Sequence, residues 1–195
     1  STDVHLYADA SYHAPVMTNE TGYHIWICLK KHFSIEETAE RHPVPVLGTD
    51  YKVKIIYKNV KVAELDVEDK IIKISLPNKY KKANNERILD IAIDKMYEQI
   101  AKVEIERAME KTRILLGFAP EDYEIKKISD LLGKCEENKI TINPEIIKYN
   151  RKFIEYVVLH EYCHLKYKSH CKSFEKMIEK YEPNYKKYER IIANV

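Results

Sequence analysis

Two histidines and a glutamate occur within five residues of this chain, in the stretch His160-Glu161-Tyr162-Cys163-His164. The apolar residues around this stretch predict a helix, and residues four apart on a helix lie on one face. His160 and His164 can therefore direct their imidazoles at one metal ion, and Glu161 can reach a water molecule on that metal. This H-E-x-x-H spacing supplies two zinc ligands and a general base from one helical turn, as in metalloproteases.

The surrounding sequence indicates that this helix face is buried. Asn150 is a suitable N-cap, and Phe153 and Val157 lie on an apolar stripe, spaced three or four residues apart, that the motif continues. A buried carboxylate without a partner, such as that of Glu161, is costly, and a metal with its bound water offsets the cost. The context therefore favours a metal site over a chance grouping of surface residues.

A catalytic zinc ion usually has three protein ligands and one water. His170 is the first candidate for the third ligand, six residues after His164. Six residues on a continuous helix rotate by about 240°, so the helix must end between the two histidines. We predict that Ser169 caps a second helix, with His170 in its first turn. Glu175 and Glu179 are alternatives, and either would give a His-His-Glu site.

Several segments of the chain resemble one known family. Residues 156–166 read YVVLHEYCHLK and residues 169–174 read SHCKSF. These segments are similar to the Y-V-V-x-H-E-L-C-H-L and H-S-x-x-F-W patterns of the YgjP-type metallopeptidases, which belong with the zincins and are related to SprT-like proteases and minigluzincins. Further similarity, at Leu47-Gly48 and over 133–143, extends the resemblance across about residues 44–190.

The resemblance implies a zincin-like metallopeptidase that binds one zinc ion per chain and hydrolyses peptide or protein substrates. The zinc ligands that it implies are His160, His164 and His170, with Glu161 as the general base. Leu132, Lys134 and Glu175 stand where the family has Trp, Ser and Trp. We expect those positions to shape the cleft, so the family's substrate preference does not carry over to this chain.

The expected mechanism uses a metal-activated water. Zinc held by three imidazoles lowers the pKa of its water to about 7. Glu161 takes the proton as hydroxide attacks the substrate carbonyl, and then passes it to the leaving amine. The strand-like run Ile140-Thr141-Ile142 precedes the motif helix, and in zincins a strand so placed edges the cleft and pairs with the substrate. The residues considered for stabilising the oxyanion are Tyr149, Tyr167, Tyr181 and Tyr185.

The rest of the sequence predicts an α+β fold, in which a small antiparallel sheet packs on the active-site helix and a long helix precedes it. Residues 1–43 are expected to form an N-terminal arm with short helices, and residues 44–195 the zincin-like domain. Within the arm, short helices are predicted over 23–33 and 34–41, and residues 1–20 are expected to be loop. The other expected elements are an antiparallel meander of strands at 51–57, 60–65 and 70–76, a helix at 86–116, strands at 123–128 and 139–142, and a helical segment at 183–195.

Composition sets broad limits on the class of protein. The 195 residues suffice for one domain with a core and a small appendage, and a net charge of +2 demands no acidic partner. No run of eighteen apolar residues predicts a membrane span, and the N-terminus has no basic region followed by an apolar core. The four cysteines form no C-x-x-C pair, which is typical of reduced thiols, so we expect a cytoplasmic location.

Two other functions fit parts of the sequence. The first is a zinc hydrolase that acts on nucleotide phosphoanhydrides, because zinc hydroxide also attacks phosphorus. Only four glycines are present, so no glycine-rich phosphate loop is evident, although several lysines could surround the cleft. Those lysines are Lys134, Lys166, Lys168 and Lys172. The second is a SprT-like, nucleic-acid-associated protease, which would need a basic or zinc-bearing DNA module that the sequence does not show. The sequence gives no indication of the oligomeric state.

Overall fold

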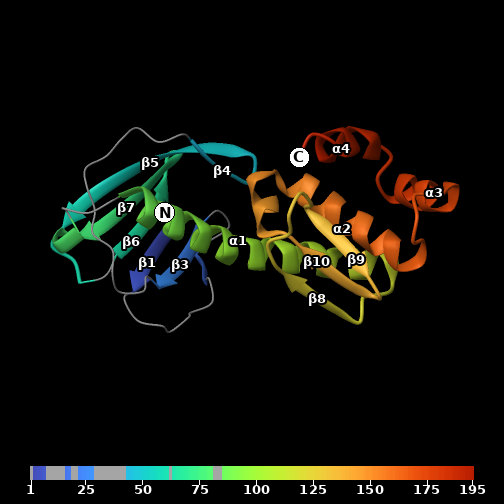
Figure 1. Cartoon of the computed structure of the whole chain (residues 1–195), viewed down its shortest axis with the longest axis horizontal. Coiled ribbons are helices and arrows are strands. Elements are labelled where there is room, and N and C mark those ends of the chain that lie inside the picture. The colour runs from blue at the N-terminus through green and yellow to red at the C-terminus, as the bar shows by residue number, and fades with distance from the viewer. Residues whose placement is uncertain (1, 8–15, 19–21, 29–42, 62, 81–84) are drawn as a thin grey trace. The chain divides into compact units, whose positions relative to one another are not determined.

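The structure is a computed structural model that describes residues 2–7, 16–18, 22–28, 43–61, 63–80 and 85–195 (Figure 1). By contacts, the chain divides into two compact units, Ser1–Ile100 and Ala101–Val195, and the long helix α1 (Asn85–Leu116) crosses that division. The sequence placed a boundary between residues 43 and 44 instead. Strands from the first 43 residues pair into the same sheet as the strands that follow them, and this is why the two divisions differ.

A seven-stranded sheet forms most of the first unit, with the strand order β2-β3-β1-β6-β7-β5-β4. Its elements are β1 (Thr2–Tyr7), β2 (Val16–Thr18), β3 (Gly22–Cys28), β4 (Val44–Val46), β5 (Thr49–Lys58), β6 (Ala63–Glu68) and β7 (Ile71–Pro77), followed by the 3₁₀ turn η1 (Asn78–Tyr80). Strand β1 runs parallel to β3, and β5 runs parallel to β7. The other neighbouring strands are antiparallel.

Strands β5 and β7 confirm two of the predicted strands, and the strand expected at 60–65 lies at 63–68. The predicted antiparallel meander is wrong, because β7 lies between β5 and β6 and runs parallel to β5. A tight turn at Asp69 and Lys70, with φ angles of 49° and 62°, joins β6 to β7. Hydrophobic alternation identifies strands but does not order them, so the sequence did not reveal this arrangement.

The N-terminal segment also differs from expectation. The helix predicted over 23–33 is wrong for its described part, because residues 22–28 form β3 between β1 and β2. That segment reads GYHIWIC, which alternates and is rich in aromatic and β-branched residues, so pairing on both sides favours the extended state. Residues 2–7 and 16–18, expected as loop, are strands. The helix predicted over 34–41 lies outside the described residues.

Apolar side chains of the sheet and of α1 make the core of the first unit. Leu65, Ile72 and Ile74 are completely buried, and so are Ala92 and Met96 on α1. The hydroxyl of Tyr97 donates a hydrogen bond to the carbonyl of Pro45 at 2.6 Å. This bond ties the helix to the short strand β4. The long helix predicted over 86–116 is therefore confirmed, and its first half is a core element of this unit.

The second unit contains a three-stranded sheet with the order β8-β10-β9. Its strands are β8 (Asp122–Ile125), β9 (Gly133–Glu136) and β10 (Lys139–Ile142). Strand β10 is parallel to β8 and antiparallel to β9, so the sheet is mixed rather than antiparallel. Glu137 and Asn138, with φ angles of 47° and 65°, form the two-residue turn between β9 and β10. The strand at 139–142 was predicted, the strand at 123–128 is shorter than predicted, and β9 was not predicted.

Helices follow the sheet to the end of the chain. They are the 3₁₀ segment η2 (Pro144–Lys148), α2 (Arg151–Lys166), α3 (Lys172–Tyr181) and α4 (Tyr185–Ile192). The predicted cap of α2 is confirmed, because Oδ1 of Asn150 accepts a hydrogen bond from the amide of Phe153 at 2.9 Å. Helix α4 confirms the helical pattern predicted at 183–195. The order of strands and helices along the chain confirms the predicted α+β class.

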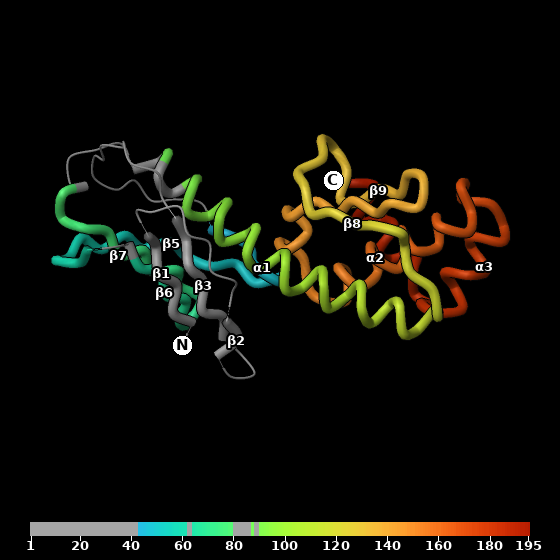
Figure 2. Tube along the Cα trace, turned by 90° about the horizontal axis from the view of Figure 1, so that it is seen from below, coloured from blue at the N-terminus to red at the C-terminus, as the bar shows by residue number. Residues whose placement is uncertain are grey.

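The second half of α1 runs alongside α2 (Figures 1 and 2). The hydroxyl of the buried Tyr162 donates to the carbonyl of Met109 at 3.1 Å. Arg151 makes two bonds of 3.0 Å to the carboxylate of Glu104, which is almost completely buried. A buried carboxylate needs such a partner, so this pair fixes how the two helices meet.

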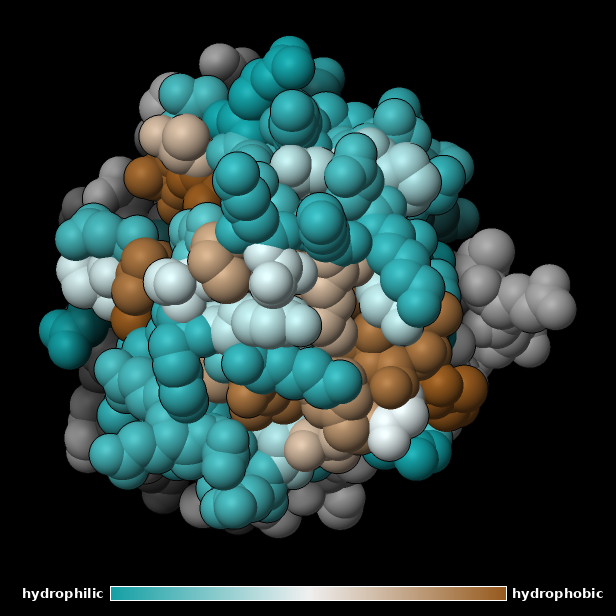
Figure 3. All heavy atoms as spheres, turned by 90° about the vertical axis from the view of Figure 1, so that its right-hand side faces the viewer, coloured by the Kyte–Doolittle hydropathy of each residue, from teal (hydrophilic) through white to brown (hydrophobic). Residues whose placement is uncertain are grey.

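The exterior of the second unit is largely hydrophilic on the face shown in Figure 3, where apolar side chains gather in smaller patches. This agrees with the charged residues that make up 33% of the sequence. No helix among the described residues is both long and apolar enough to cross a membrane.

Candidate metal centre

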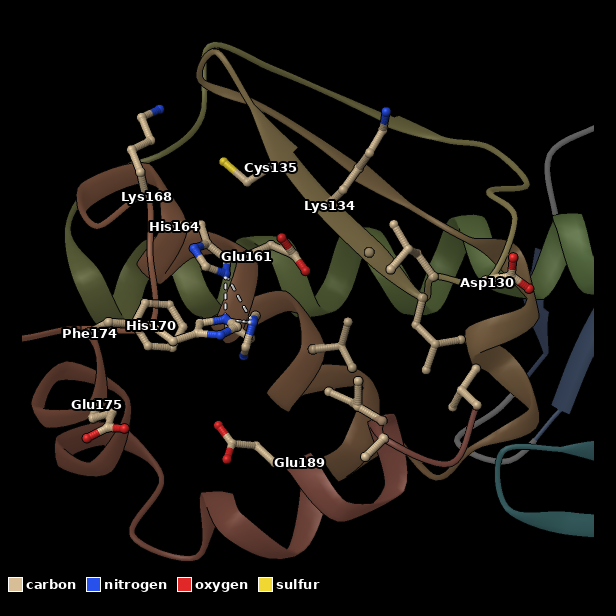
Figure 4. A pocket seen from close by; sticks show the side chains of 18 residues that line it. Asp130, Lys134, Cys135, Glu161, His164, Lys168, His170, Phe174, Glu175 and Glu189 are labelled. Atoms are coloured by element: carbon tan, nitrogen blue, oxygen red, sulfur yellow. Dashed lines mark hydrogen bonds between the residues drawn. The ribbon is translucent and has the colours of Figure 1, made fainter. Parts of the chain in front are cut away.

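A cavity of about 690 Å³ opens between α2, strand β9 and the C-terminal helices of the second unit (Figure 4). Both histidines of the H-E-x-x-H motif line it, and so do Glu161 and His170. Strand β9 contributes Gly133, Lys134 and Cys135 to the lining. The cavity therefore contains the predicted metal-binding side chains and a β-strand beside them.

The three predicted ligands converge on one point. The Nε2 atoms of His160 and His164 lie 3.2 Å apart, those of His164 and His170 lie 3.0 Å apart, and those of His170 and His160 lie 3.1 Å apart. With zinc–nitrogen distances of about 2.0–2.1 Å, two nitrogens of a tetrahedral site lie about 3.3 Å apart. Three hydrogen bonds cannot satisfy three mutually facing nitrogens, whereas one cation can accept all three lone pairs. These residues fit a single metal ion.

The local backbone explains how His170 reaches the other two histidines. Helix α2 ends at Lys166, and the chain turns through Tyr167 before α3 begins. The predicted break between His164 and His170 is thus present. The predicted cap of α3 is wrong, because Cys171 rather than Ser169 is its N-cap residue, and His170 precedes the helix instead of lying in its first turn.

The protonation of the imidazoles suits metal binding. Burial, together with the nearby imidazoles of His164 and His170, lowers the pKa of His160 to about 3. Burial also lowers the pKa of His164, although its bond to the backbone of Tyr167 acts in the opposite direction. Nδ1 of His164 lies 3.0 Å from the carbonyl oxygen of Tyr167, which selects the tautomer whose Nε2 carries a lone pair. Within the described residues, Nδ1 of His160 has no hydrogen-bond partner.

The ring of Phe174 packs against all three imidazoles. Its ring centroid lies 5.0 Å from that of His160, 4.6 Å from that of His164 and 4.7 Å from that of His170. The side chain is almost completely buried on α3. The sequence indicated Phe174 only as part of the segment 169–174 that resembles the family pattern. Its spacing of four residues from His170 was the available signal for a role at the site.

Glu161 lies against the first residue of β9. Its side chain is buried, and burial raises the pKa of its carboxyl to about 8. A Cβ atom on Gly133 would lie 3.0 Å from both Cγ and Oε1 of Glu161. Contacts of that length require the neighbouring side chain to give by a few tenths of an ångström, so a larger residue at position 133 would press on the Glu161 carboxylate.

The sequence predicted that residues 140–142 edge the cavity, but the neighbouring strand β9 lines it instead. Ile140, Thr141 and Ile142 are buried, and β10 is paired on both sides, so the prediction of an edge strand there is wrong. The two outer strands are β8 and β9, and β9 is the one that lines the cavity. The sequence did not predict β9, because GKCE lacks an alternating apolar pattern. The turn at 137–138 places β9 beside α2, and this depends on pairing rather than on local propensity.

The structure shows which of the other residues proposed from the sequence lie at the cavity and which do not. Glu175 lines the cavity, whereas Glu179 does not. In the described parts of the chain, the group of atoms suited to one metal consists of His160, His164 and His170 alone. The four tyrosines considered for the oxyanion do not belong to the described lining of the cavity, and neither do Lys166 and Lys172.

Asn143 is a further residue that positions the site. Its side-chain amide donates to the carbonyls of Ile128 and Leu131, and its Oδ1 accepts a hydrogen bond from the amide of Glu145. Its backbone amide bonds to Leu132 at 2.9 Å. These bonds join the loop before β9 to the segment that leads into α2, so Asn143 links the two sides of the cavity.

Three converging imidazoles beside a buried glutamate, in an open cavity, define a site of the metallohydrolase class. The chain belongs to the YgjP-like family, because the family model described as YgjP-like, metallopeptidase domain, matches residues 27–194. The suggested family resemblance is thereby confirmed, and the chain is a metal-dependent peptidase, a hydrolase.

Two solved structures are similar to part of the chain. The metallopeptidase zymogen abylysin of Pyrococcus abyssi matches with a TM-score of 0.42 and 23% identity, over 47% of this chain and 94% of that one. The metallopeptidase zymogen jannalysin of Methanocaldococcus jannaschii matches with a TM-score of 0.42 and 20% identity, over 47% of this chain and 88% of that one. A comparison with curated proteins gave no significant match.

Proposed function

We propose that this protein is a zinc-dependent peptidase in which His160, His164 and His170 bind the metal and Glu161 is the general base. The observation that carries the proposal is the convergence of three Nε2 atoms within 3.0–3.2 Å of one another, next to the buried Glu161. A bound zinc ion would supply Lewis-acid chemistry, by activating water and polarising the substrate carbonyl.

The donor set favours zinc over other divalent ions. Neutral imidazoles suit zinc, whereas magnesium and calcium prefer oxygen ligands. Three protein ligands, rather than four, are typical of catalytic zinc sites. The ligands also line an open cavity instead of being enclosed, so a substrate can approach them.

Glu161 would move the proton. It would take a proton from the attacking water and deliver it to the nitrogen of the leaving amine. Burial favours its neutral form, but a nearby cation favours the carboxylate, so metal loading would restore the basic form near neutral pH. Gly133 leaves room for the Glu161 side chain, which lies against β9.

We propose β9 as the strand that receives the substrate. It is one of the two outer strands of its sheet, and it lines the same cavity as the histidines. An extended peptide could add to this edge through main-chain hydrogen bonds, which hold a substrate with little dependence on its sequence. The predicted contact with residues 140–142 would then be indirect, through the pairing of β10 with β9.

The geometry gives less support to phosphoanhydride substrates. Of the four lysines considered, only Lys134 and Lys168 line the cavity. Lys134 already forms an ion pair with Glu136 at 2.9 Å. A peptide substrate is therefore the better fit to this cavity.

Metal analysis and a peptide digest test the proposal together. Wild-type protein purified without chelators should contain about one zinc per chain, and His164→Ala and His170→Ala should lose it. The matched control is His24→Ala, a histidine substitution in the first unit. The zinc-loaded wild type should also cleave members of a mixed peptide library. Protein without zinc, or zinc-loaded protein that cleaves no peptide, would contradict the proposal.

A further inference from the structure

We infer that Glu189 is a specificity residue that binds a cationic group of the substrate beside the scissile bond. This inference rests on the proposed peptidase function and adds a class of substrate to it. Glu189 belongs to α4 and lines the same cavity as the three histidines. In Figure 4 its side chain extends from α4 into the cavity, below the labelled His170 and Glu161.

A buried tyrosine orients this carboxylate. The hydroxyl of Tyr156 donates to Oε1 of Glu189 at 3.4 Å. The ring of Tyr156 stacks on Tyr188 with centroids 4.9 Å apart, and its edge meets the ring of His160 at 6.0 Å. The side chain that anchors Glu189 therefore also packs against a predicted metal ligand, which ties the position of the carboxylate to the site.

Glu189 is placed to contact a substrate rather than the metal. The atoms of His160, His164 and His170 that suit one metal lie within 4.8 Å of one another, and no oxygen of Glu189 belongs to this group. A carboxylate that served as a metal ligand would have an oxygen within this group of atoms. Glu189 therefore lies outside the metal-binding group, on the part of the cavity lining that would contact a bound peptide.

Within the described structure, Glu189 accepts a hydrogen bond from the neutral hydroxyl of Tyr156. The side chain of Glu189 is half-buried, and no described lysine or arginine forms an ion pair with it. The adjoining lining residues on the same helix and after it, Ile192 and Ala193, are apolar. A partly buried carboxylate is stabilised by a cation that replaces part of its lost solvation. The substrate can bring that cation into the cavity.

Two groups on a peptide have this chemistry, namely the side chain of Lys or Arg and a free N-terminal amine. A peptide added to β9 presents alternate side chains to opposite sides. One of these sides is the cavity that Glu189 lines together with β9. We therefore expect preferred peptide substrates to carry a positive charge at one fixed position relative to the cleaved bond.

The test compares cleavage preferences of the zinc-loaded protein and its variants. Two libraries of random decapeptides, one with acetylated and one with free N-termini, are digested and the cleavage sites are read by mass spectrometry. Wild type should cleave peptides with Lys or Arg at one position about tenfold more efficiently than the same peptides with Gln. Glu189→Gln, which keeps an acceptor for Tyr156, should abolish this preference, and Glu189→Lys should reverse it toward Asp or Glu.

Glu179→Gln is the matched control, because Glu179 is an exposed glutamate of α3 outside the cavity lining. It should retain the wild-type preference. A preference confined to the library with free N-termini identifies the terminal amine as the cation. A preference present in both libraries identifies a side chain.

A second readout does not depend on turnover. In the Glu161→Gln background, the best Lys peptide and its Gln counterpart are compared by fluorescence anisotropy. The Lys peptide should bind about tenfold more tightly, and added Glu189→Gln should remove the difference. Cleavage without any charge preference would overturn this inference and leave the proposed function intact. A wild type that neither cleaves nor binds peptides would overturn both.

Discussion

The two walls of the cavity reach their positions in different ways. The α2 wall carries its two histidines four residues apart on one helix, so local helical geometry alone brings them together. The β9 wall depends on pairing with β10, on a two-residue turn and on a glycine that leaves space for Glu161. Changes to the helix wall should therefore act on metal binding, and changes to the strand wall should act on catalysis while metal remains bound.

The largest expected effect lies where the two walls meet. Glu161→Gln should lower kcat by about 10²–10⁴-fold, because the amide cannot accept the proton of the attacking water. The zinc content should stay at the wild-type level, since Glu161 is not among the converging metal-binding atoms. Steady-state kinetics with metal analysis on the same sample checks both points. Turnover near that of wild type would exclude the general-base role.

Metal binding by the α2 histidines is tested at Phe174, which lies on α3 and packs against them. Phe174→Ala removes a buried ring that contacts all three imidazoles, and it should destabilise the protein by about 3–5 kcal/mol. Zinc affinity should fall as well, because the imidazoles lose the surface that orients them. Denaturant melts and zinc titration of the variant measure the two effects.

Phe118→Ala is the control for that experiment. Phe118 is half-buried and packs on Tyr162 and Lys166, away from the imidazoles. It should cost less stability and leave zinc affinity unchanged. Equal losses of zinc affinity in the two variants would mean that general destabilisation, rather than the contact with the histidines, governs the site.

The strand wall is tested at its glycine. Gly133→Ala should lower kcat/KM by about 10- to 100-fold, because a Cβ atom would displace the Glu161 carboxylate from its place. Zinc content should not change. Gly117→Ala is the matched control, because Gly117 has a φ of 76° and nothing within 4 Å of an added Cβ. It should cost about 1 kcal/mol of stability and leave kcat/KM unchanged. A Gly133→Ala variant with full activity would show that Glu161 tolerates displacement.

The same contrast explains which features were predictable from the sequence. The motif, the Asn150 cap and the break before His170 follow from spacing and capping, and the sequence indicated all of them. The cap of α3 was assigned to Ser169, whereas the structure uses Cys171, which makes no side-chain capping bond. Capping propensity favours serine, so the sequence offered no signal for this choice.

Features that depend on distant pairing were missed. Strand β9 has no apolar alternation, and Glu137 is an unusual residue for a turn position with positive φ. The parallel pairing of β5 with β7 and the pairing of β3 with β1 and β2 are likewise set by the sheet as a whole. Local propensity does not specify neighbours in a sheet, which is why the helix wall was predicted and the strand wall was not.

The smallest expected effect comes from the titration of Glu161 and His160, both on α2, in the metal-free protein. Burial raises the pKa of Glu161 to about 8 from an ordinary value of 4.5, so the folded protein keeps this proton over a pH range in which the unfolded chain releases it. Stability from this group is present below pH 4.5 and is lost as the pH rises toward 8. The pKa of His160 is lowered to about 3 from 6.5, so its contribution has the opposite sign and is lost as the pH falls below 6.5.

Glu161→Gln removes the first titration and keeps the second, so the difference between variant and wild type isolates the glutamate. In the presence of a chelator, the variant should gain about 1–3 kcal/mol relative to wild type between pH 5 and pH 8. Chemical denaturation at several pH values measures this difference, and the contribution of His160 cancels because both proteins share it. With zinc bound, the gain should disappear, because the cation favours the ionised Glu161 and removes the cost of burying its charge. A pH-independent difference in the metal-free proteins would mean that Glu161 is ionised even without metal, and that the strand wall does not desolvate it.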